Sequence, residues 1–428
     1  MIVFGLLVLL LLLALSVPVA ASLGLLSFSL AIFFTPIPLD RMLGEVAWRA
    51  MASESLVAIP YFVLLGEVMV RSGLAERMYA ALVEWMSWLP GGTMHANIGA
   101  SALFAATSGS SVATAATLGT VSIPEISRRG YNERLFLGSL AAGGTLGILI
   151  PPSIILIIYG VLTDTSIPRL YLAGILPGIV LAGLFMLTIA VACWIRPAMG
   201  GNPPAWTWKR RVAVLPDLLP PLFIFGLVVG TIYAGIATPT EAAAFGVVGA
   251  LGLAARVRAI NLDMVRKVLE GTMRTTAMVV AIILMSTILN FVLAFLGISR
   301  SITGFVETLN IGPLTLIAVL VLFYLVLGCF LEGMSVMIVT VPIVAPIVVA
   351  AGFDLIWFGI VMTLLLEMAL ITPPVGVNLF VVQSVRGRGS LSDVMIGTVP
   401  FVLTILAMIV LLAAFPGIAL WLPDLAYQ

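Results

Sequence analysis

A double proline inside a long apolar run is the feature that most constrains this chain. Residues 143–152 (GGTLGILIPP) combine three glycines with the pair Pro151-Pro152. Proline removes a backbone donor and clashes with the preceding turn, so a helix that passes through this stretch must open. Inside a bilayer, open backbone is tolerated only where it is buried in protein or lines a cavity. The stretch therefore predicts an interrupted helix at an internal site.

The composition is that of a polytopic membrane protein. Of the 428 residues, 62% are hydrophobic and 9% are charged, and several apolar runs exceed the ~20 residues that a spanning helix needs. Such runs favour helices over the short alternating strands of a membrane barrel. A net charge of +1 argues against a nucleic-acid partner. Residues 1–17 lack a basic leading region and precede a second apolar run, so we interpret them as a spanning helix rather than a signal peptide.

The backbone-breaking residues recur in the second half of the chain. A shift of 222 residues places Pro124 on Pro346, Gly130 on Gly352 and Pro151-Pro152 on Pro373-Pro374. Paired broken helices in corresponding halves of a membrane protein indicate the binding site of a secondary transporter. We therefore predict an all-α fold of two repeats.

Each repeat is predicted to contain five spanning helices, one re-entrant hairpin and one broken helix. The hairpins are expected at 93–126, with a tip at 107–111 and arms too short to span comfortably, and at 312–351, with a tip at 331–335. The broken helices are expected at 135–163 and 355–385, and interfacial amphipathic arms at 71–90 and 297–310. The remaining spans are expected at 2–17, 19–36, 55–70, 169–195, 216–234, 237–255, 275–296 and 391–421. Charged linkers are expected at 40–54 and from 256 to 274.

An odd number of crossings in each half requires the second half to be inverted relative to the first. The positive-inside rule gives the orientation. If both ends of the first hairpin are cytoplasmic, 16 of the 20 Lys and Arg residues fall on the cytoplasmic side. Only Arg41, Arg49, Arg169 and Arg300 remain outside. Both termini are then predicted to be external.

The hairpin tips and helix breaks carry the oxygen atoms that a hard cation needs. Broken helix ends leave backbone carbonyls, which favour cations, and amides, which favour anions. Serine and threonine hydroxyls add ligands, although small residues would also permit close helix packing. We therefore predict two pseudo-symmetric Na⁺ sites. The first comprises Ser108, Ser110, Ser111, Gly144, Thr145 and Gly147; the second comprises Gly333, Ser335, Leu370, Thr372 and Pro373.

Solute contacts are expected at the same tips and breaks. The candidates are Ser110, Ser111, Pro151, Pro152, Pro374 and Asn378, of which Asn378 has the alternative role of capping the restarted helix. Carboxylates inside a membrane are costly and functional by default. Glu332 and Glu367 are candidate coupling carboxylates that bind a cation, carry a proton or hold a hairpin through backbone amides. Glu67 and Glu241 are interpreted as structural or interfacial.

Other chemistries have weaker support. Cys193 and Cys329 lie in apolar segments and are interpreted as packing residues, and a single histidine, His95, excludes a multi-histidine metal centre. The Gly-x4-Gly-Lys-Ser/Thr motif does not occur, so neither a nucleotide nor an organic cofactor is expected. A membrane-embedded hydrolase with a Ser110–His95 pair is the alternative from another class, but such an enzyme would not need two symmetric broken helices.

Four segments together resemble one transporter family. Residues 107–119 (TSGSSVATAATLG), 143–152, 176–178 (LPG) and 371–378 (ITPPVGVN) are similar to the large membrane subunit of tripartite ATP-independent periplasmic (TRAP) transporters. The resemblance implies Na⁺-coupled uptake of an organic acid, such as a C4-dicarboxylate or sialic acid. It also implies a periplasmic binding protein that delivers the solute, and a small four-helix membrane subunit supplied by a separate chain.

The family resemblance further implies an elevator mechanism in a bacterial or archaeal cytoplasmic membrane. A transport domain of residues 93–168 and 312–388 would slide against a scaffold of residues 1–92 and 169–311, with a C-terminal spanning helix in 389–428. The runner-up is a stand-alone Na⁺/carboxylate symporter of related architecture, and a hydrolase or a membrane scaffold protein is the third alternative. The identity of the solute is not predicted.

Overall fold

The computed structural model describes residues 2–15, 17–35, 39–203, 207–298, 304, 312–328 and 332–427. Throughout these ranges the regular structure is helical, which confirms the all-α prediction. Cys329, the predicted tip residue Leu331 and most of the predicted second arm, 297–310, lie outside the described residues.

The N-terminal helices follow the apolar segments, with one exception. Helices α1 (Ile2–Ala14) and α2 (Val19–Phe34) flank Pro18, and α4 (Glu54–Arg71) follows Ser53. Most of the predicted linker at 40–54 is instead a helix, α3 (Leu39–Met51). The linker prediction is wrong there because Leu43, Val46 and Met51 recur at roughly helical spacing and pack on the core.

The helices predicted for the first arm, hairpin and broken helix are present, with shifted ends, while the interfacial and re-entrant placements stay predictions. The arm is α5 (Leu74–Met86), and the hairpin is α6 (Thr93–Ser108) and α7 (Ser111–Arg129). Helix α7 extends beyond the predicted end at 126 because Glu125 pairs with Arg128 and Arg129, and it ends at the left-handed Gly130. The broken helix is α8 (Glu133–Thr145), the short 3₁₀ turn η1 (Leu146–Ile148) and α9 (Ile154–Thr163).

The middle of the chain contains a longer helix than predicted. Helix α10 (Ile167–Ile195) leads through η2 (Pro197–Gly200), α11 (Trp208–Ala213) and η3 (Leu215–Leu218) to α12 (Leu219–Tyr233), α13 (Pro239–Arg256) and α14 (Leu262–Phe295). The linker predicted up to residue 274 is therefore wrong from Leu262 onward. The Asn261 side chain caps α14 by accepting a hydrogen bond from the Met264 amide, and two i,i+4 ion pairs follow.

The C-terminal part repeats the pattern of a hairpin followed by a broken helix. Helices α16 (Pro313–Gly328) and α17 (Gly333–Ala350) lie on either side of the second tip, and α18 (Leu355–Ile371) and α19 (Val377–Arg386) on either side of the second double proline. Both Pro-Pro bonds are cis. The last predicted span, 391–421, divides into α20 (Leu391–Ala414) and α21 (Gly417–Ala426), because Pro416 follows the end of α20.

Five helices in the described ranges are long and apolar enough to cross a membrane, or six if the bent pair formed by α3 and α4 counts as one span. They are α10, α12 with η3, α14, α17 and α20. Other apolar helices, including α2, α16 and α18, are shorter than a full membrane span. The chain is thus a helical membrane protein, while five crossings in each half stay a prediction.

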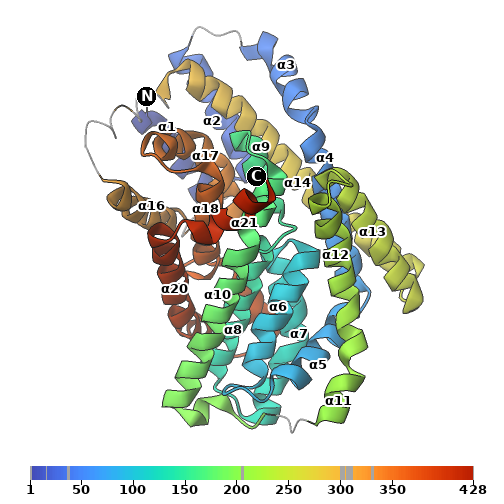
Figure 1. Ribbon diagram of the computed structural model, residues 1–428. Coiled ribbons are helices and arrows are strands. Elements are labelled where there is room, and N and C mark those ends of the chain that lie inside the picture. The colour runs from blue at the N-terminus through green and yellow to red at the C-terminus, as the bar shows by residue number, and fades with distance from the viewer. Residues whose placement is uncertain are drawn as a thin grey trace.

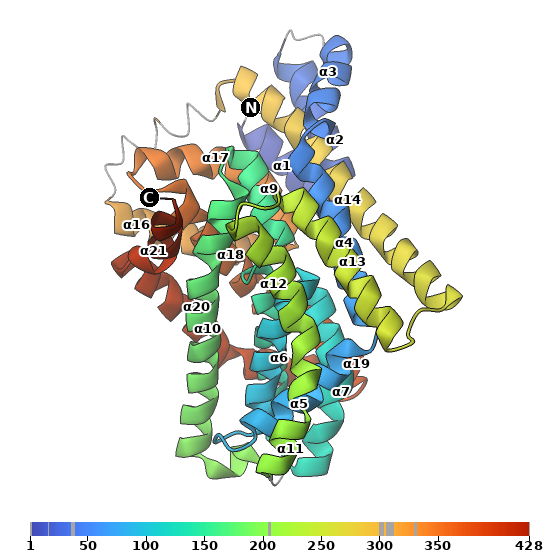
Figure 2. The ribbon, with the colours of Figure 1, turned by 45° about the vertical axis from the view of Figure 1, so that its right-hand side comes forward.

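The two broken helices run antiparallel to each other (Figures 1 and 2). The hydroxyl of Tyr159, on α9, donates a hydrogen bond of 2.7 Å to the carbonyl of Leu355, at the start of α18. At the opposite ends, Arg386 of α19 pairs with Glu133 of α8 at 2.9 Å. Each broken helix therefore begins where the other ends. This is the arrangement that an inverted repeat requires, although inversion of the complete halves stays a prediction.

Helix α18 is at the centre of the fold. It packs against α8, α9, α10, α16, α17, α19, α20 and α21. All of residues 357–371 are buried, as expected for a helix that is apolar on every side. A second group of helices, α2, α4, α12, α13 and α14, pack on one another, and α4 also contacts α6 and α9.

Two glycines allow α8 and α20 to approach closely. A Cβ atom added to Gly138 would overlap the carbonyl of Gly397, and one added to Gly397 would overlap the carbonyl of Arg134. Small residues are the usual means by which helices pack backbone to backbone inside a membrane. The contact joins the first broken helix to the predicted C-terminal spanning helix.

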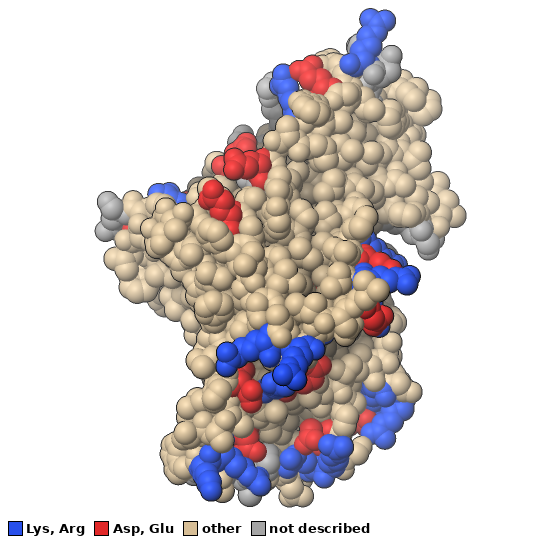
Figure 3. Space-filling view, turned by 90° about the vertical axis from the view of Figure 1, so that its right-hand side faces the viewer, with Lys and Arg blue, Asp and Glu red and all other residues tan. Residues whose placement is uncertain are grey.

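Basic residues are more frequent at one end of the molecule. Figure 3 shows most of the visible Lys and Arg residues between mid-height and the lower end of the molecule, and a few near the upper end. The lower end in Figures 1 and 2 holds α11, whereas α1 and α21 lie in the upper half. Both terminal helices are thus on the side opposite the basic end, and the external location of the termini stays a prediction.

We expect Gly138→Ala to reduce stability by about 1–3 kcal/mol, because the new methyl group forces α8 and α20 apart. Gly183→Ala, on α10, is the control, since nothing lies within 4 Å of a Cβ atom at that position. Thermal denaturation in detergent measures both variants. Equal melting temperatures for the two variants would contradict the close packing of Gly138 and Gly397.

Candidate functional site

The first hairpin tip is a short turn of hydroxyl-bearing residues. Helix α6 ends at Ser108, Gly109 adopts a left-handed conformation, and the Ser110 hydroxyl caps α7 by accepting a hydrogen bond from the Ala113 amide at 3.3 Å. The Thr114 hydroxyl donates to the Ser110 carbonyl at 2.7 Å, so the Ser108 hydroxyl donates to Thr114 at 3.0 Å. The tip is therefore held by its own side chains.

The first helix break is enclosed and internally bonded. Ser153, the residue after Pro151-Pro152, donates its hydroxyl to the Ile148 carbonyl at 2.5 Å and accepts a hydrogen bond from the Leu156 amide at 3.4 Å. All residues of 143–154 are buried. One hydroxyl thus connects the last turn before the break to the first turn after it.

The tip and the break are in backbone contact. A Cβ atom added to Gly147 would lie 2.9 Å from the Ser110 carbonyl oxygen, and one added to Gly109 would lie 3.1 Å from the Pro152 carbonyl oxygen. On the other side of the tip, a Cβ on Gly66 of α4 would lie 2.8 Å from the Ser108 carbonyl oxygen. Only glycine permits approaches this close. The structure therefore brings Ser110 and Gly147 together, as predicted for the first site.

Asn378 belongs to the second broken helix but binds the first site. Its Nδ2 donates to the Ser111 hydroxyl at 2.7 Å and to the Ala141 carbonyl at 3.1 Å, and Gly144 lies beside it. Its Oδ1 is buried without a hydrogen-bond partner among the described residues. Gly376, rather than Asn378, is the N-cap of α19, so the structure excludes the alternative capping role.

Described parts of both hairpin tips line one cavity of about 120 Å³. The first tip contributes residues 108–113, and the second contributes Glu332, Gly333 and Met334. Leu370 of α18 and Ile148 of η1 come from the two breaks. The wall opposite the tips is formed by Val63, Gly66, Glu67 and Val70 of α4 and by Thr275 of α14. Five residues of the two predicted sites thus line one cavity between the tips and α4: Ser108, Ser110, Ser111, Gly333 and Leu370.

Glu67 lines the cavity, although the sequence did not predict it as a site residue. It was expected to be structural or interfacial, and it does accept a hydrogen bond from Arg71 at 2.8 Å and lie against Gly271 of α14. It also lines the cavity. The sequence did contain a signal for this role, since Glu67 is a carboxylate that follows a glycine inside an apolar span. Glu241, in contrast, is structural, because it forms a capping box with Thr238 at the start of α13.

The second site differs from the first. The Glu332 carboxylate caps α17 by accepting hydrogen bonds from the Met334 and Ser335 amides at 3.1 and 3.2 Å, and from the Ser335 hydroxyl at 3.2 Å. Of the roles considered for Glu332, the structure shows the one that holds the hairpin. The Thr372 hydroxyl donates to the Met368 carbonyl at 2.6 Å.

The second break is also more open than the first. Pro373 and Pro374 are exposed, whereas Pro151 and Pro152 are buried. Neither Thr372 nor Pro374 lines the shared cavity, so the structure does not bring these two predicted residues to the first tip. The second break reaches the cavity through Leu370.

Glu367 faces the first break rather than the second tip. It is fully buried in α18, close to Thr145 at the end of α8, whose hydroxyl donates to the Ala142 carbonyl at 2.8 Å. The 222-residue shift aligns these same two residues in sequence, and the structure places them against each other. Neither carboxyl oxygen has a hydrogen-bond partner among the described residues.

The alternative hydrolase pair does not form. His95 is in the first turn of α6 and Ser110 lies beyond its last residue, which separates them by about 22 Å along the helix. The His95 ring donates from Nε2 to the Pro90 carbonyl at 2.8 Å. Cys193 is buried in α10 and packs against the core, as expected.

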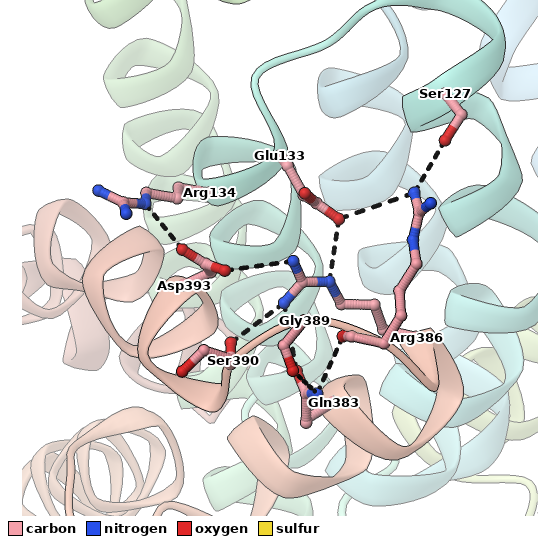
Figure 4. Close-up of polar contacts among 9 residues, drawn as sticks. Ser127, Glu133, Arg134, Gln383, Arg386, Gly389, Ser390 and Asp393 are labelled. Carbon is pink, nitrogen blue, oxygen red and sulfur yellow. Dashed lines mark hydrogen bonds and ion pairs between the residues drawn. The ribbon is translucent and has the colours of Figure 1, made fainter.

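A network of ion pairs joins the ends of three helices outside the cavity (Figure 4). The Arg386 side chain is only 3% exposed and contacts Glu133 at 2.9 Å, Asp393 at 3.3 Å and the Ser390 carbonyl at 3.1 Å. Arg134 pairs with Asp393 at 3.0 Å. The network connects the start of α8 with the end of α19 and the start of α20.

We expect Arg386→Met to lower the melting temperature by a few degrees, because it leaves two carboxylates without their buried partner. Arg134→Met, which removes a side chain that is 55% exposed, should cause no measurable shift. Thermal melts in detergent test both variants. If the two variants melt alike, the buried guanidinium is not what connects these helix ends.

Comparison with known proteins identifies relatives along nearly the whole chain. The family model described as "Tripartite ATP-independent periplasmic transporter, DctM component" matches residues 6–418. The C4-dicarboxylate TRAP transporter large permease protein of Vibrio cholerae is 34% identical over 96% of this chain and 94% of its own length. The sialic acid TRAP transporter large permease protein of the same organism is 32% identical over 87% of this chain and 86% of its own.

A solved transporter shares the fold. The YdaH transporter of Alcanivorax borkumensis superposes with a TM-score of 0.60 and 16% identity, over 96% of this chain and 99% of that one. At this identity the likeness concerns the fold alone. Nearly equal identity to a dicarboxylate permease and a sialic acid permease leaves the solute undecided.

Proposed function

The chain belongs to the DctM component family of tripartite ATP-independent periplasmic transporters, and we propose that it takes up an organic acid with Na⁺ as the coupling ion. As a large permease it is the membrane subunit of a tripartite system, which implies a small membrane subunit and a periplasmic binding protein. We assign it to the cytoplasmic membrane of a bacterium or archaeon. The prediction that best fits these relatives is the TRAP permease rather than the stand-alone symporter.

The shared cavity is the observation that carries this proposal. It lies where two hairpin tips and two helix breaks converge, and such convergence marks the solute and ion sites of transporters built on broken helices. Its first wall carries the hydroxyls of Ser108, Ser110 and Ser111. Gly147 of the first break packs directly against Ser110 and Ser111 of that wall. Oxygen ligands of these kinds suit Na⁺ as a hard cation.

The solute carboxylate is proposed to bind at the first tip. The N-terminus of α7 lines the cavity, and its first amides have no partner within the helix, although the Ser110 hydroxyl accepts from that of Ala113. Amides at this end of the helix dipole favour an anion. At the second tip, the Glu332 carboxylate already occupies the equivalent amides of α17. The first tip is therefore the better anion site.

We propose an elevator mechanism, which the position of the cavity supports. One wall belongs to the predicted transport domain, and the other is α4 of the predicted scaffold. A volume of about 120 Å³ is well below the roughly 300–1,000 Å³ of a typical small-molecule site. Admission of a solute therefore requires the tips to move away from α4. Where α4 contacts Ser108, it contributes Gly66, which has no side chain to interlock with the tip. Such a contact favours sliding of the tip along α4.

We expect uptake of an organic acid into proteoliposomes that contain this chain with its small subunit and binding protein. Uptake should require an inward Na⁺ gradient and should be lost when choline replaces Na⁺. A panel of labelled C4-dicarboxylates and sialic acid provides the measurement. Absence of uptake under every inward Na⁺ gradient would sink the proposal, and uptake without the binding protein would favour the stand-alone symporter.

We expect Ser110→Ala to raise the Na⁺ concentration for half-maximal uptake about tenfold, which corresponds to the loss of one hydrogen bond or ligand to a charged species. The variant also loses a helix cap. Ser390→Ala is the matched control, because Ser390 caps α20 by accepting a hydrogen bond from Ser392 away from the cavity. An unchanged Na⁺ requirement in Ser110→Ala would move the cation site elsewhere.

A further inference from the structure

A cleft of about 640 Å³ between α7 and α19 has no role in the proposed function. One wall comes from α7, between Gly119 and Arg128, and the other from Val385, Arg386 and Arg388 at and just beyond the end of α19. Its volume is within the roughly 300–1,000 Å³ of a typical small-molecule site. The cleft shares no lining residue with the cavity at the hairpin tips.

The two walls belong to different halves of the chain. Helices α7 and α19 pack together, and a Cβ atom added to Gly119 would lie 3.3 Å from a methyl carbon of Val385. Near the end of α7, the Ser127 hydroxyl accepts a hydrogen bond of 2.8 Å from Arg388 (Figure 4). The cleft therefore forms only when the first hairpin and the second broken helix are assembled.

The charged residues that line the cleft, in a part of the chain that is fully described, are all arginines. The side chains of Arg128 and Arg388 are 74% and 60% exposed, so a ligand can reach both. Arg386 is buried, and it is engaged by Glu133 and Asp393. The two exposed guanidinium groups are therefore the ones available to an anion.

The ion-pair network around the cleft has more positive than negative groups. Its five guanidinium groups share three carboxylates, and none of the carboxylates lines the cleft. The members are Arg128, Arg129, Arg134, Arg386 and Arg388 with Glu125, Glu133 and Asp393. Two positive charges are thus not compensated within the network. A phosphate monoester carries about −1.5 to −2 charges near pH 7, which matches this excess.

The two exposed arginines also have unused hydrogen-bond donors. Among the described residues, Arg128 contacts Glu125 through Nη1 alone, at 3.3 Å. Arg388 uses Nη2 alone, at 2.8 Å from the Ser127 hydroxyl and 3.8 Å from Glu133. A guanidinium group offers its N–H donors as a planar fork that matches the oxygens of a phosphate. The remaining donors of both residues therefore suit a phosphate better than a spherical anion.

The cleft is apolar away from the arginines. Ile123, Pro124 and Val385 line it, and the rise of a helix gives it a length of about 13 Å from Gly119 to Arg128. The predicted orientation places both arginines on the cytoplasmic side, where basic residues attract the headgroups of anionic lipids. An apolar wall beside a basic mouth suits a phosphate that is esterified to an apolar group as well as a free one.

We propose that Arg128 and Arg388 form a phosphate site in the cleft between α7 and α19. Its ligand is either a soluble phosphate or the headgroup of an anionic phospholipid. The phosphate accepts hydrogen bonds from both guanidinium groups, and it thereby links the first hairpin to the end of the second broken helix. The site goes beyond the proposed function, and its failure would leave Na⁺ coupling untouched.

The first test is equilibrium dialysis of labelled inorganic phosphate against the full, delipidated chain in a non-ionic detergent. We expect Arg388→Gln and Arg128→Gln each to weaken binding about tenfold, because each removes a hydrogen bond to a charged group. Arg266→Gln is the matched control and should bind as the unmodified chain does. Like Arg128, Arg266 is an exposed helix residue with one acidic partner, Glu270, but it does not line the cleft.

The second test supplies the phosphate on a lipid. The same four proteins are placed in vesicles of phosphatidylcholine, with or without phosphatidic acid, and their thermal unfolding is measured. If the site takes a lipid, phosphatidic acid should raise the melting temperature of the unmodified chain and of Arg266→Gln, but not of Arg388→Gln or Arg128→Gln. A variant-dependent response to inorganic phosphate identifies a soluble ligand, and one to phosphatidic acid alone identifies a lipid.

The proposal is overturned if neither probe distinguishes Arg388→Gln or Arg128→Gln from Arg266→Gln, whether because nothing binds or because binding persists. Melting temperatures without either probe check that each variant folds. Arg388→Gln also alters the contact with Ser127, so Arg128→Gln, which leaves that contact intact, decides the outcome if Arg388→Gln is unstable.

Discussion

The need to satisfy backbone polar groups inside an apolar protein is the constraint on which this structure depends. Each double proline opens a helix where water is scarce, and each opening leaves carbonyls and amides to be paired. At the first break, the Ser153 hydroxyl bridges the two sides. At the second break the Thr372 hydroxyl donates to a backbone carbonyl, and at the second tip the Glu332 carboxylate accepts from two backbone amides. The hairpin tips pack close to these breaks because glycines allow backbone to meet backbone.

The two halves share a plan but differ in chemistry. The first break is enclosed, and its tip presents hydroxyls and open helix amides. The second break is exposed, and its tip carries a carboxylate that already occupies the amides of α17. Glu367 reaches out of the second half to the end of α8, as Asn378 reaches to the tip of the first hairpin. Each half therefore contributes a residue that contacts the break or the tip of the other half.

The broken helices of the two halves are also joined directly. They are joined at one end by Tyr159 and Leu355 and at the other by Arg386 and Glu133. Gly138 and Gly397 bring α20 directly against α8. Across the cavity, the contact of α4 with the tip is made at a glycine, with no side chain from Gly66 to interlock. These contacts hold the two broken helices and α20 together, whereas the contact of Ser108 with α4 is made at a glycine.

The order of hairpins and broken helices was predictable from sequence, because prolines and glycines act locally on the backbone to which they belong. The same locality explains the errors. The charged segments at 40–54 and 256–274 read as linkers, but i,i+4 ion pairs and packing on the core make them largely helical. The ends of α7 and α20 were displaced for similar reasons, since local ion pairs or a single proline decide where a helix stops.

Sequence by itself determined that the chain is a helical membrane protein, where its helices break, and which residues supply oxygen atoms at those breaks. These properties follow from hydropathy and from backbone chemistry at individual positions. Only the tertiary structure decided that both tips share one cavity, that Glu67 lines it, that Asn378 binds the first tip, and that Glu367 faces Thr145. Those contacts join residues more than 200 positions apart in most cases, and their geometry depends on how antiparallel helices pack rather than on any local pattern.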